Sequence, residues 1–227
     1  MKVKICGHTR LEDIAFSFDC GAYLCGVVVE VASSKRSVSV DTAIPLFENY
    51  RNRMVALTAD ADNHLLDRIA TRLKPGALQL TANETPERVK EIRELYGIPV
   101  YKSLHLPADS GTKQKTSNLV STAKFFIETI SHYKKAGADG FILDTSIPGS
   151  YGGSGKRSDW GIAKQIIAGT DAKLFLAGGI DPENAAEALK LQPFAIDLAS
   201  GVETAPGLKS KDKIKALFKA VNSLNDL

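Results

Sequence analysis

The chain has 227 residues, of which 44% are hydrophobic and 24% charged, a composition typical of a globular protein with one large domain or two small ones. Its formal net charge of +3 and evenly scattered Lys and Arg argue against a nucleic-acid partner and favour a small anionic metabolite. No stretch has the apolar length needed to span a membrane, and the strand-like residues 2–5 leave no room for a signal sequence. We therefore expect a cytoplasmic protein, or an organellar one whose transit segment has been removed.

Short apolar or β-branched runs alternate with longer segments of helical period, which is typical of βα units and a parallel sheet. The predicted strands are Lys2–Cys6, Tyr23–Val29, Met54–Thr58, Ala77–Leu80, Val100–Leu104, Gly140–Asp144, Ala172–Leu176 and Phe194–Leu198. Eight such units predict an α/β protein, a (β/α)8 TIM barrel whose single domain covers residues 1–227. The alternative is an open doubly wound sheet, but the first strand ends in Cys6-Gly7-His8-Thr9 and not in the usual G-x-G-x-x-G.

Helix start signals follow several of these strands. We expect Thr9 to cap a helix over residues 11–18. Thr85-Pro86-Glu87 and Asp181-Pro182-Glu183 each predict a helix with proline in its first turn. The polar segment Pro107–Ser117 is expected to be a mobile loop before a long helix.

The cysteines and histidines do not suggest a disulfide framework or a metal site. The three cysteines have neither CxxC spacing nor an even count, so we expect reduced thiols. The four histidines form no HxxxH or HxH pair, so we expect no metal, and each is assigned a surface or satisfied-core role. The residues concerned are Cys6, Cys20, Cys25, His8, His64, His105 and His132.

Two strand ends carry residues suited to acid/base chemistry. In a barrel the carboxyl ends of all strands point to one face, so functional residues are expected there. Cys6 ends the first strand before a glycine and a helix start, where a thiol can act as base or nucleophile, although a buried cysteine is otherwise an inert small hydrophobe. Asp144 ends the sixth strand, where a carboxylate buried without a partner would be costly. We predict that the two form an acid/base pair.

Three glycine-containing loops predict an anion site at the same face. They are Tyr151-Gly152-Gly153-Ser154-Gly155-Lys156, Ala177-Gly178-Gly179-Ile180 and Ala199-Ser200-Gly201-Val202-Glu203. Backbone N–H groups can converge on a phosphate there, although the same glycines could simply form tight turns. Arg36, on the loop after the second strand, is either an exposed solvated charge or a bidentate carboxylate ligand, and the sequence leaves both possibilities open.

The ordered combination of motifs resembles the phosphoribosylanthranilate isomerase family of tryptophan biosynthesis. The motifs are Lys4-Ile5-Cys6-Gly7, Ser34-Lys35-Arg36, Leu143-Asp144-Thr145, the three glycine loops, and Asp197-Leu198 leading into the last of them. The resemblance implies a (β/α)8 barrel that carries out a cofactor-free Amadori rearrangement of N-(5'-phosphoribosyl)anthranilate.

The resemblance also implies a role for each candidate residue. Asp144 would be the general acid that opens the ribose ring, and Cys6 the general base that removes the proton from C2. Arg36 would bind the anthranilate carboxylate, with Gln79 as a second substrate-binding residue. The phosphate ligands would be Gly155, Gly178, Gly179, Ser200 and Gly201. The phosphorylated substrate would be the only partner, with no nucleic acid or membrane, and the protein a monomer or homodimer.

The proposed roles require shifted pKa values. The ordinary pKa of a cysteine thiol is about 8.5 and that of an aspartate carboxyl about 3.9. At neutral pH an ordinary cysteine is therefore protonated, although a base must be ionised, and an ordinary aspartate is ionised, although an acid must be protonated. We expect burial to raise the pKa of Asp144, while the helix start and the substrate favour the thiolate of Cys6.

The chain also departs from the family pattern. Gln79-Leu80-Thr81-Ala82 stands where members usually have Gln-Leu-His-Gly, and Leu57-Thr58-Ala59-Asp60 where Phe-Val-Asn is common. A related phosphosugar isomerase of altered specificity and a non-catalytic phosphosugar-binding barrel are therefore alternatives. Metal-dependent epimerases would need strand-end histidines, and a synthase-type barrel a strand-end lysine, whereas Lys102 lies within its strand.

Overall fold

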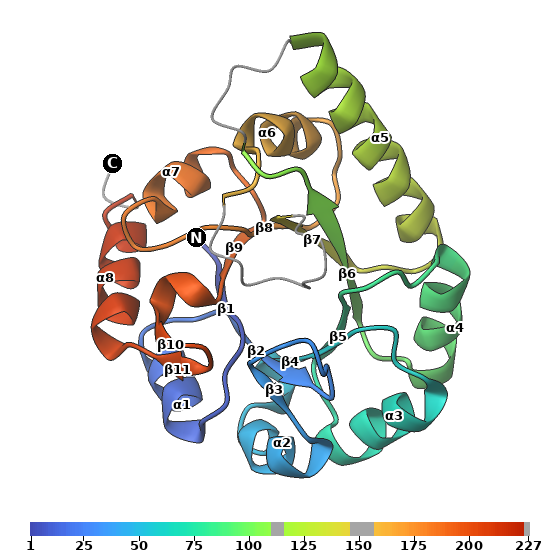
Figure 1. The fold of residues 1–227 in the computed structure, drawn as a ribbon, viewed down its shortest axis with the longest axis vertical. Coiled ribbons are helices and arrows are strands. Elements are labelled where there is room, and N and C mark those ends of the chain that lie inside the picture. The colour runs from blue at the N-terminus through green and yellow to red at the C-terminus, as the bar shows by residue number, and fades with distance from the viewer. Residues whose placement is uncertain (110–115, 146–156, 225–227) are drawn as a thin grey trace.

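The computed structural model describes residues 1–109, 116–145 and 157–224, and it shows a ring of parallel strands surrounded by helices (Figure 1). The strands pair in the order β1-β9-β8-β7-β6-β5-β4-β2, and β1 pairs with β2 to close the ring. All of these pairs are parallel. The prediction of a (β/α)8 barrel is confirmed, and the open doubly wound sheet is excluded because the first and last strands of the barrel are hydrogen-bonded neighbours.

The barrel strands lie close to their predicted positions. They are β1 (Val3–Ile5), β2 (Leu24–Val29), β4 (Met54–Thr58), β5 (Ala77–Leu80), β6 (Val100–Leu106), β7 (Gly140–Thr145), β8 (Leu174–Leu176) and β9 (Ala195–Leu198). The short β3 (Ser37–Val38) extends the sheet beside β2, and β10 (Glu203–Ala205) forms a hairpin with β11 (Leu208–Lys209). The largest differences are at β6, which continues two residues beyond its predicted end, and at β8, which begins two residues later than predicted.

Helices follow the strands around the outside of the ring. They are α1 (Leu11–Asp19), α2 (Val40–Phe47), α3 (Asn63–Arg68), α4 (Pro86–Tyr96), α5 (Thr116–Lys135), α6 (Trp160–Ala168), α7 (Ala185–Lys190) and α8 (Lys211–Asn222). Short η elements cover Arg51–Arg53, Ile69–Leu73 and Ser200–Val202. Within the described ranges, none of the helices has the length and apolar character needed to cross a membrane.

Two predicted helix starts are confirmed, at Leu11 for α1 and at Pro86 for α4, whereas the start at Asp181 and the capping role of Thr9 were wrong. Thr85 caps α4 by accepting a hydrogen bond from the Arg88 N–H. Thr9 does not cap α1, because its hydroxyl donates to the Gly207 carbonyl at 2.7 Å. Asp181 accepts hydrogen bonds from the N–H groups of a turn that precedes α7, so the helix begins later than expected. The loop predicted over 107–117 lies partly outside the described residues.

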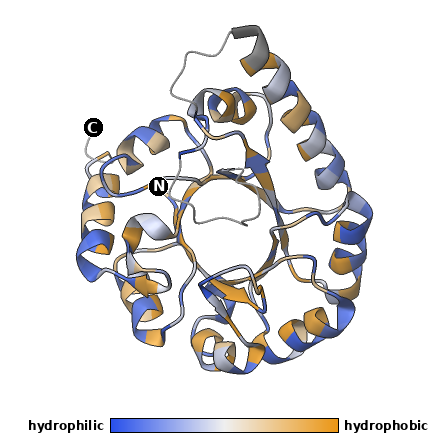
Figure 2. Ribbon diagram, viewed as in Figure 1, coloured by the Kyte–Doolittle hydropathy of each residue, from blue (hydrophilic) through white to orange (hydrophobic). Residues whose placement is uncertain are grey.

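The alternation of residues along each strand builds two apolar layers. On β2, Val27 and Val29 join the large cluster between sheet and helices, whereas Val28 belongs to a smaller cluster inside the barrel. On β4, Ala56 faces the helices and Leu57 faces the interior. Figure 2 shows the same arrangement, with hydrophobic residues along the strands and hydrophilic ones on the outer surfaces of the helices. Both faces of a parallel barrel are therefore buried, and its strand ends are left to carry function.

Candidate active site

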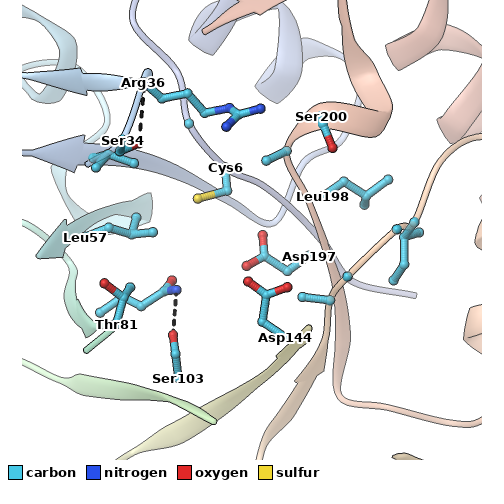
Figure 3. Close-up of a pocket in the computed structure, with 18 of the residues that line it drawn as sticks. Cys6, Ser34, Arg36, Leu57, Thr81, Ser103, Asp144, Asp197, Leu198 and Ser200 are labelled. Atoms are coloured by element: carbon cyan, nitrogen blue, oxygen red, sulfur yellow. Dashed lines mark hydrogen bonds between the residues drawn. The ribbon is translucent and has the colours of Figure 1, made fainter. Parts of the chain in front are cut away.

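A cavity lies at the carboxyl ends of the barrel strands and is lined by residues from the first strand to the loop after the last (Figure 3). The predicted site residues that line it are Cys6, Arg36, Gln79, Asp144, Gly178, Gly179 and Ser200. Gly201 is not among the lining residues, and Gly155 lies outside the described residues. The topology thus brings side chains from distant parts of the sequence into one pocket.

Cys6 follows β1 and is held by backbone contacts. Its N–H donates to the Leu198 carbonyl at 2.7 Å, and its carbonyl accepts from Lys209 Nζ. A side chain at Gly26 would place its Cβ 3.0 Å from Cys6 Sγ, so the glycine leaves room for the sulfur. Burial raises the pKa of the Cys6 thiol, and the charge of Lys4 opposes this only in part. Without substrate the group is therefore a thiol, which differs from the expected bias towards thiolate.

Asp144 lies near the end of β7 and is half-buried against the cavity. Its Oδ1 accepts the Thr145 N–H at 2.8 Å. Burial raises its pKa, and the charge of Asp197 adds to the rise, while the Thr145 N–H and the charge of His105 lower it. A general acid that works at neutral pH needs a raised pKa, so the pKa of Asp144 is shifted in the required direction.

A buried ion pair that the sequence interpretation missed lies beside these two groups. Lys4 Nζ contacts Asp197 Oδ2 at 2.6 Å, and the two side chains are 0% and 6% exposed. The residues face each other across the β1–β9 register. Lys4 and Asp197 were noted only as members of motifs, since a predicted barrel pairs its first and last strands without fixing the register that sets these two residues opposite each other.

Arg36 is a cavity residue and not a solvated charge, since its side chain is 12% exposed. It is held by Glu203, whose carboxylate accepts from Arg36 Nε at 3.0 Å and Nη2 at 2.7 Å. Glu203 also accepts from Lys209 Nζ at 2.8 Å. Gly7 has φ of +76°, and a Cβ there would lie 2.4 Å from Arg36 Cδ, so its lack of a side chain is what admits the arginine.

Gln79 and its neighbours form a polar wall. Gln79 Nε2 donates to Ser103 Oγ at 3.1 Å, while its buried Oε1 has no partner among the described residues. His105 also lines the cavity, and its Nε2 donates to the Thr81 carbonyl at 2.9 Å. The surface or core role assigned to His105 was wrong because β6 is longer than predicted, so Ser103 and His105 point to the same side of the strand. An imidazole is thus present on the cavity wall although Thr81 replaces the usual histidine.

Gly178, Gly179 and Ser200 line one part of the cavity. The two glycines have φ of +85° and +65°. The backbone N–H groups of all three residues have no hydrogen-bond acceptor within the described part of the chain, so they are available to an anion. At Gly201 an added Cβ would lie 2.0 Å from the Ile180 carbonyl oxygen, which gives this glycine a packing reason of its own.

No group of three or more His, Cys, Asp or Glu residues is arranged to hold a metal ion in ranges 1–109, 116–145 and 157–224. The ionisable groups that line the cavity in the described part of the chain are one guanidinium, two carboxyls, one imidazole and one thiol. A closed parallel barrel that carries these groups at its strand ends defines a (β/α)8-barrel enzyme.

Comparison with known proteins identifies the family. Residues 3–220 match the family described as N-(5'-phosphoribosyl)anthranilate (PRA) isomerase. The N-(5'-phosphoribosyl)anthranilate isomerase of Chelativorans sp. (strain BNC1) is 35% identical over 231 residues, which cover 98% of this chain and 96% of that protein. The chain therefore belongs to the N-(5'-phosphoribosyl)anthranilate isomerase family, and the resemblance inferred from its motifs is confirmed.

Solved structures agree with this assignment. Phosphoribosyl anthranilate isomerase from Thermus thermophilus has a TM-score of 0.76 and 32% identity, covering 99% of this chain and 100% of that chain. A phosphoribosyl anthranilate isomerase in complex with reduced 1-(o-carboxyphenylamino)-1-deoxyribulose 5-phosphate has a TM-score of 0.75 and 27% identity, and the match covers 98% of this chain and 99% of that chain.

Proposed function

We propose that this chain converts N-(5'-phosphoribosyl)anthranilate to 1-(2-carboxyphenylamino)-1-deoxyribulose 5-phosphate in tryptophan biosynthesis. The observation that carries the proposal is that a thiol and a carboxyl of raised pKa line one cavity together with a guanidinium. These groups supply a base, an acid and a site for a substrate carboxylate.

In the first step the protonated Asp144 donates its proton to the ribose ring oxygen. The C1–O bond breaks, and the nitrogen lone pair forms the C1=N bond of a protonated Schiff base. Burial raises the pKa of Asp144 and so favours the protonated carboxyl that this step uses. The resulting carboxylate is stabilised by the Thr145 N–H at 2.8 Å.

In the second step Cys6 removes the proton from C2. The electron pair moves into the C1–C2 bond and neutralises the iminium nitrogen, giving an enolamine, which becomes the ketone when C1 gains a proton and the C2 hydroxyl loses one. The thiol must first lose its own proton, and the positive charges of Lys4, Lys209 and the iminium group favour the thiolate. The protonated imine serves as the electron sink, so the reaction as written uses no metal or organic cofactor.

Substrate binding follows from the charges at the cavity rim. Glu203 engages Nε and Nη2 of Arg36, which leaves Nη1 to bind the anthranilate carboxylate. The N–H groups of Gly178, Gly179 and Ser200 bind the phosphate, and we keep Gly155 and Gly201 as further candidates. Gln79, which lines the cavity and donates to Ser103, contacts the substrate on the other wall. The protein acts as a monomer or homodimer, without nucleic acid.

Complementation of a tryptophan auxotroph that lacks this isomerase tests the proposal. The chain should restore growth without tryptophan, and Cys6→Ala should not. Absence of growth, with folded protein present in the cells, would contradict the proposal. Binding of the reduced product analogue without complementation would instead favour a non-catalytic barrel, and turnover of another phosphosugar amine would favour altered specificity.

A further inference from the structure

The end of β6 sets an imidazole beside the proposed general acid. Its last two residues, His105 and Leu106, pair in parallel register with Asp144 and Thr145 of β7. Neighbouring strands lie about 4.8 Å apart, and paired residues carry their side chains to the same face of the sheet. That face is the barrel interior, since both His105 and Asp144 line the cavity. Figure 3 shows Ser103, two residues before His105 on β6, and Asp144 on this part of the cavity wall.

The imidazole is held from its other side by the strand end of β5. Its Nε2 lies 2.9 Å from the Thr81 carbonyl oxygen, and because a carbonyl can only accept, this nitrogen carries a proton. Thr81 is itself fixed, since its N–H and its hydroxyl both donate to the Thr58 carbonyl, at 2.9 and 2.6 Å. His105 is only half-buried, so water in the cavity can reach the ring, and an imidazole can carry a positive charge near neutral pH.

Charged groups from three other strands act on Asp144. Asp197 on β9 raises the pKa of this carboxyl, whereas His105 on β6 and Lys4 on β1 lower it. Lys4 pairs with Asp197 at 2.6 Å, so the charges of these two groups largely offset each other at a third position. The other strand beside β7 is β8, whose three residues are all apolar. His105 is therefore the cationic group that faces Asp144 from the two strands that flank it.

Ring opening changes the charge of Asp144 from neutral to negative, because the carboxyl gives its proton to the ring oxygen. A positive charge beside it gains little from the neutral carboxyl and much more from the carboxylate. Such an interaction strengthens as the proton moves, so it lowers the barrier of the step as well as the energy of its product. The Thr145 N–H supplies one contact of this kind at 2.8 Å, and an imidazolium on β6 supplies a second.

We propose that His105 is a positioning residue for the general acid: its imidazolium stabilises the Asp144 carboxylate that ring opening creates, and the Thr81 carbonyl holds it in place. His105 neither gives nor takes a proton in this role, so the proton that Asp144 donates still ends on the ring oxygen and the balance of the reaction is unchanged. The catalytic part of the proposal rests on the proposed function, whereas the electrostatic contact between the two side chains belongs to the free protein.

The first test measures the acid in the free protein. The carboxyl carbon of Asp144, assigned by its absence in Asp144→Asn, is titrated by carbon NMR in wild type, His105→Gln and His105→Arg. Glutamine removes the charge but keeps an N–H for the Thr81 carbonyl, and arginine keeps both. The pKa of Asp144 should rise by at least about 0.5 in His105→Gln and should not rise in His105→Arg. A smaller rise in His105→Gln, or an equal rise in both variants, would overturn the proposal.

The second test follows the reaction in single-turnover experiments, so that product release does not enter. In His105→Gln the rate constant should fall at least about fivefold, while the affinity for the reduced product analogue changes by less than about twofold. The fall in rate at high pH, where Asp144 loses its proton, should move to higher pH, because the pKa of the acid is then higher. His105→Arg should recover most of the rate. A slower His105→Gln whose pH profile is not displaced would indicate a merely structural role and would contradict the proposal.

His132 provides the matched control, because it is exposed on the outer helix α5 and does not line the cavity. His132→Gln should keep the wild-type pKa of Asp144 and the wild-type rate, and an effect there as large as that of His105→Gln would overturn the proposal. If wild-type protein does not turn over the substrate, the proposed function fails. The carbon titration still decides whether His105 acts on Asp144, which makes the two failures distinguishable.

Discussion

Replacing Glu203 with glutamine tests the charge network behind the cavity. Glu203 is 4% exposed, and its carboxylate pairs with Arg36 at 2.7 Å and with Lys209 at 2.8 Å. Glutamine keeps one acceptor oxygen but loses the charge, so two partly or fully buried cations remain without their counter-ion. Breaking a buried pair typically costs about 3–5 kcal/mol. For a chain of this length that corresponds to a fall in Tm of roughly 6–20 °C.

Urea unfolding, followed by the fluorescence of Trp160, measures this loss. Glu12→Gln is the control, because its carboxylate is 62% exposed and pairs with Arg10 at 3.4 Å, so its removal should cost less than about 1 kcal/mol. The same Glu203→Gln protein should show a raised KM, since Arg36 would no longer be oriented for a substrate carboxylate. A loss of stability below about 1 kcal/mol for Glu203→Gln would refute the argument that this carboxylate holds the two cations.

Three further predictions concern the cavity. Gly7→Ala should raise KM by about tenfold or more with the fold retained, since its Cβ would displace Arg36; an unchanged KM in steady-state assays would contradict the steric argument. Asp144→Asn should be more stable than wild type at pH values above the raised pKa of Asp144, because the folded state disfavours the ionised carboxylate. The difference in the free energy of unfolding should vanish below about pH 3.9, the pKa of an unfolded aspartate, and urea titrations at several pH values measure this difference. Iodoacetamide should alkylate Cys6 slowly at neutral pH, because burial raises the pKa of the thiol. Rapid labelling of Cys6, detected by mass spectrometry, would argue against a protonated thiol in the free protein.

The barrel could be predicted because each strand carries its own local signal. Met54–Thr58 and Ala77–Leu80 have the bounds expected from their apolar runs. The strand ends then follow from the fold, which is why Cys6 and Asp144 were expected to share a cavity, as they do. Their catalytic roles, and those of the other site residues, remain predictions.

The features that were missed depend on contacts between distant segments. Lys4 pairs with a residue 193 positions away, and Arg36 with one 167 positions away. Thr9 has the sequence of an N-cap, but its hydroxyl bonds Gly207 instead, so a tertiary contact outweighs the local preference. His105 was misplaced because the end of a strand depends on its neighbour, here β7, whose Asp144 lies opposite it in register.

Turnover of N-(5'-phosphoribosyl)anthranilate by wild type, Cys6→Ala and Asp144→Asn, followed by the loss of substrate fluorescence, tests the central claim most directly. We predict that wild type consumes the substrate, and that each variant is folded, binds the reduced product analogue and turns over at least about 100-fold more slowly. An inactive wild-type protein, or a variant with near-normal turnover, would contradict the assignment of a cysteine base and an aspartic acid across one cavity.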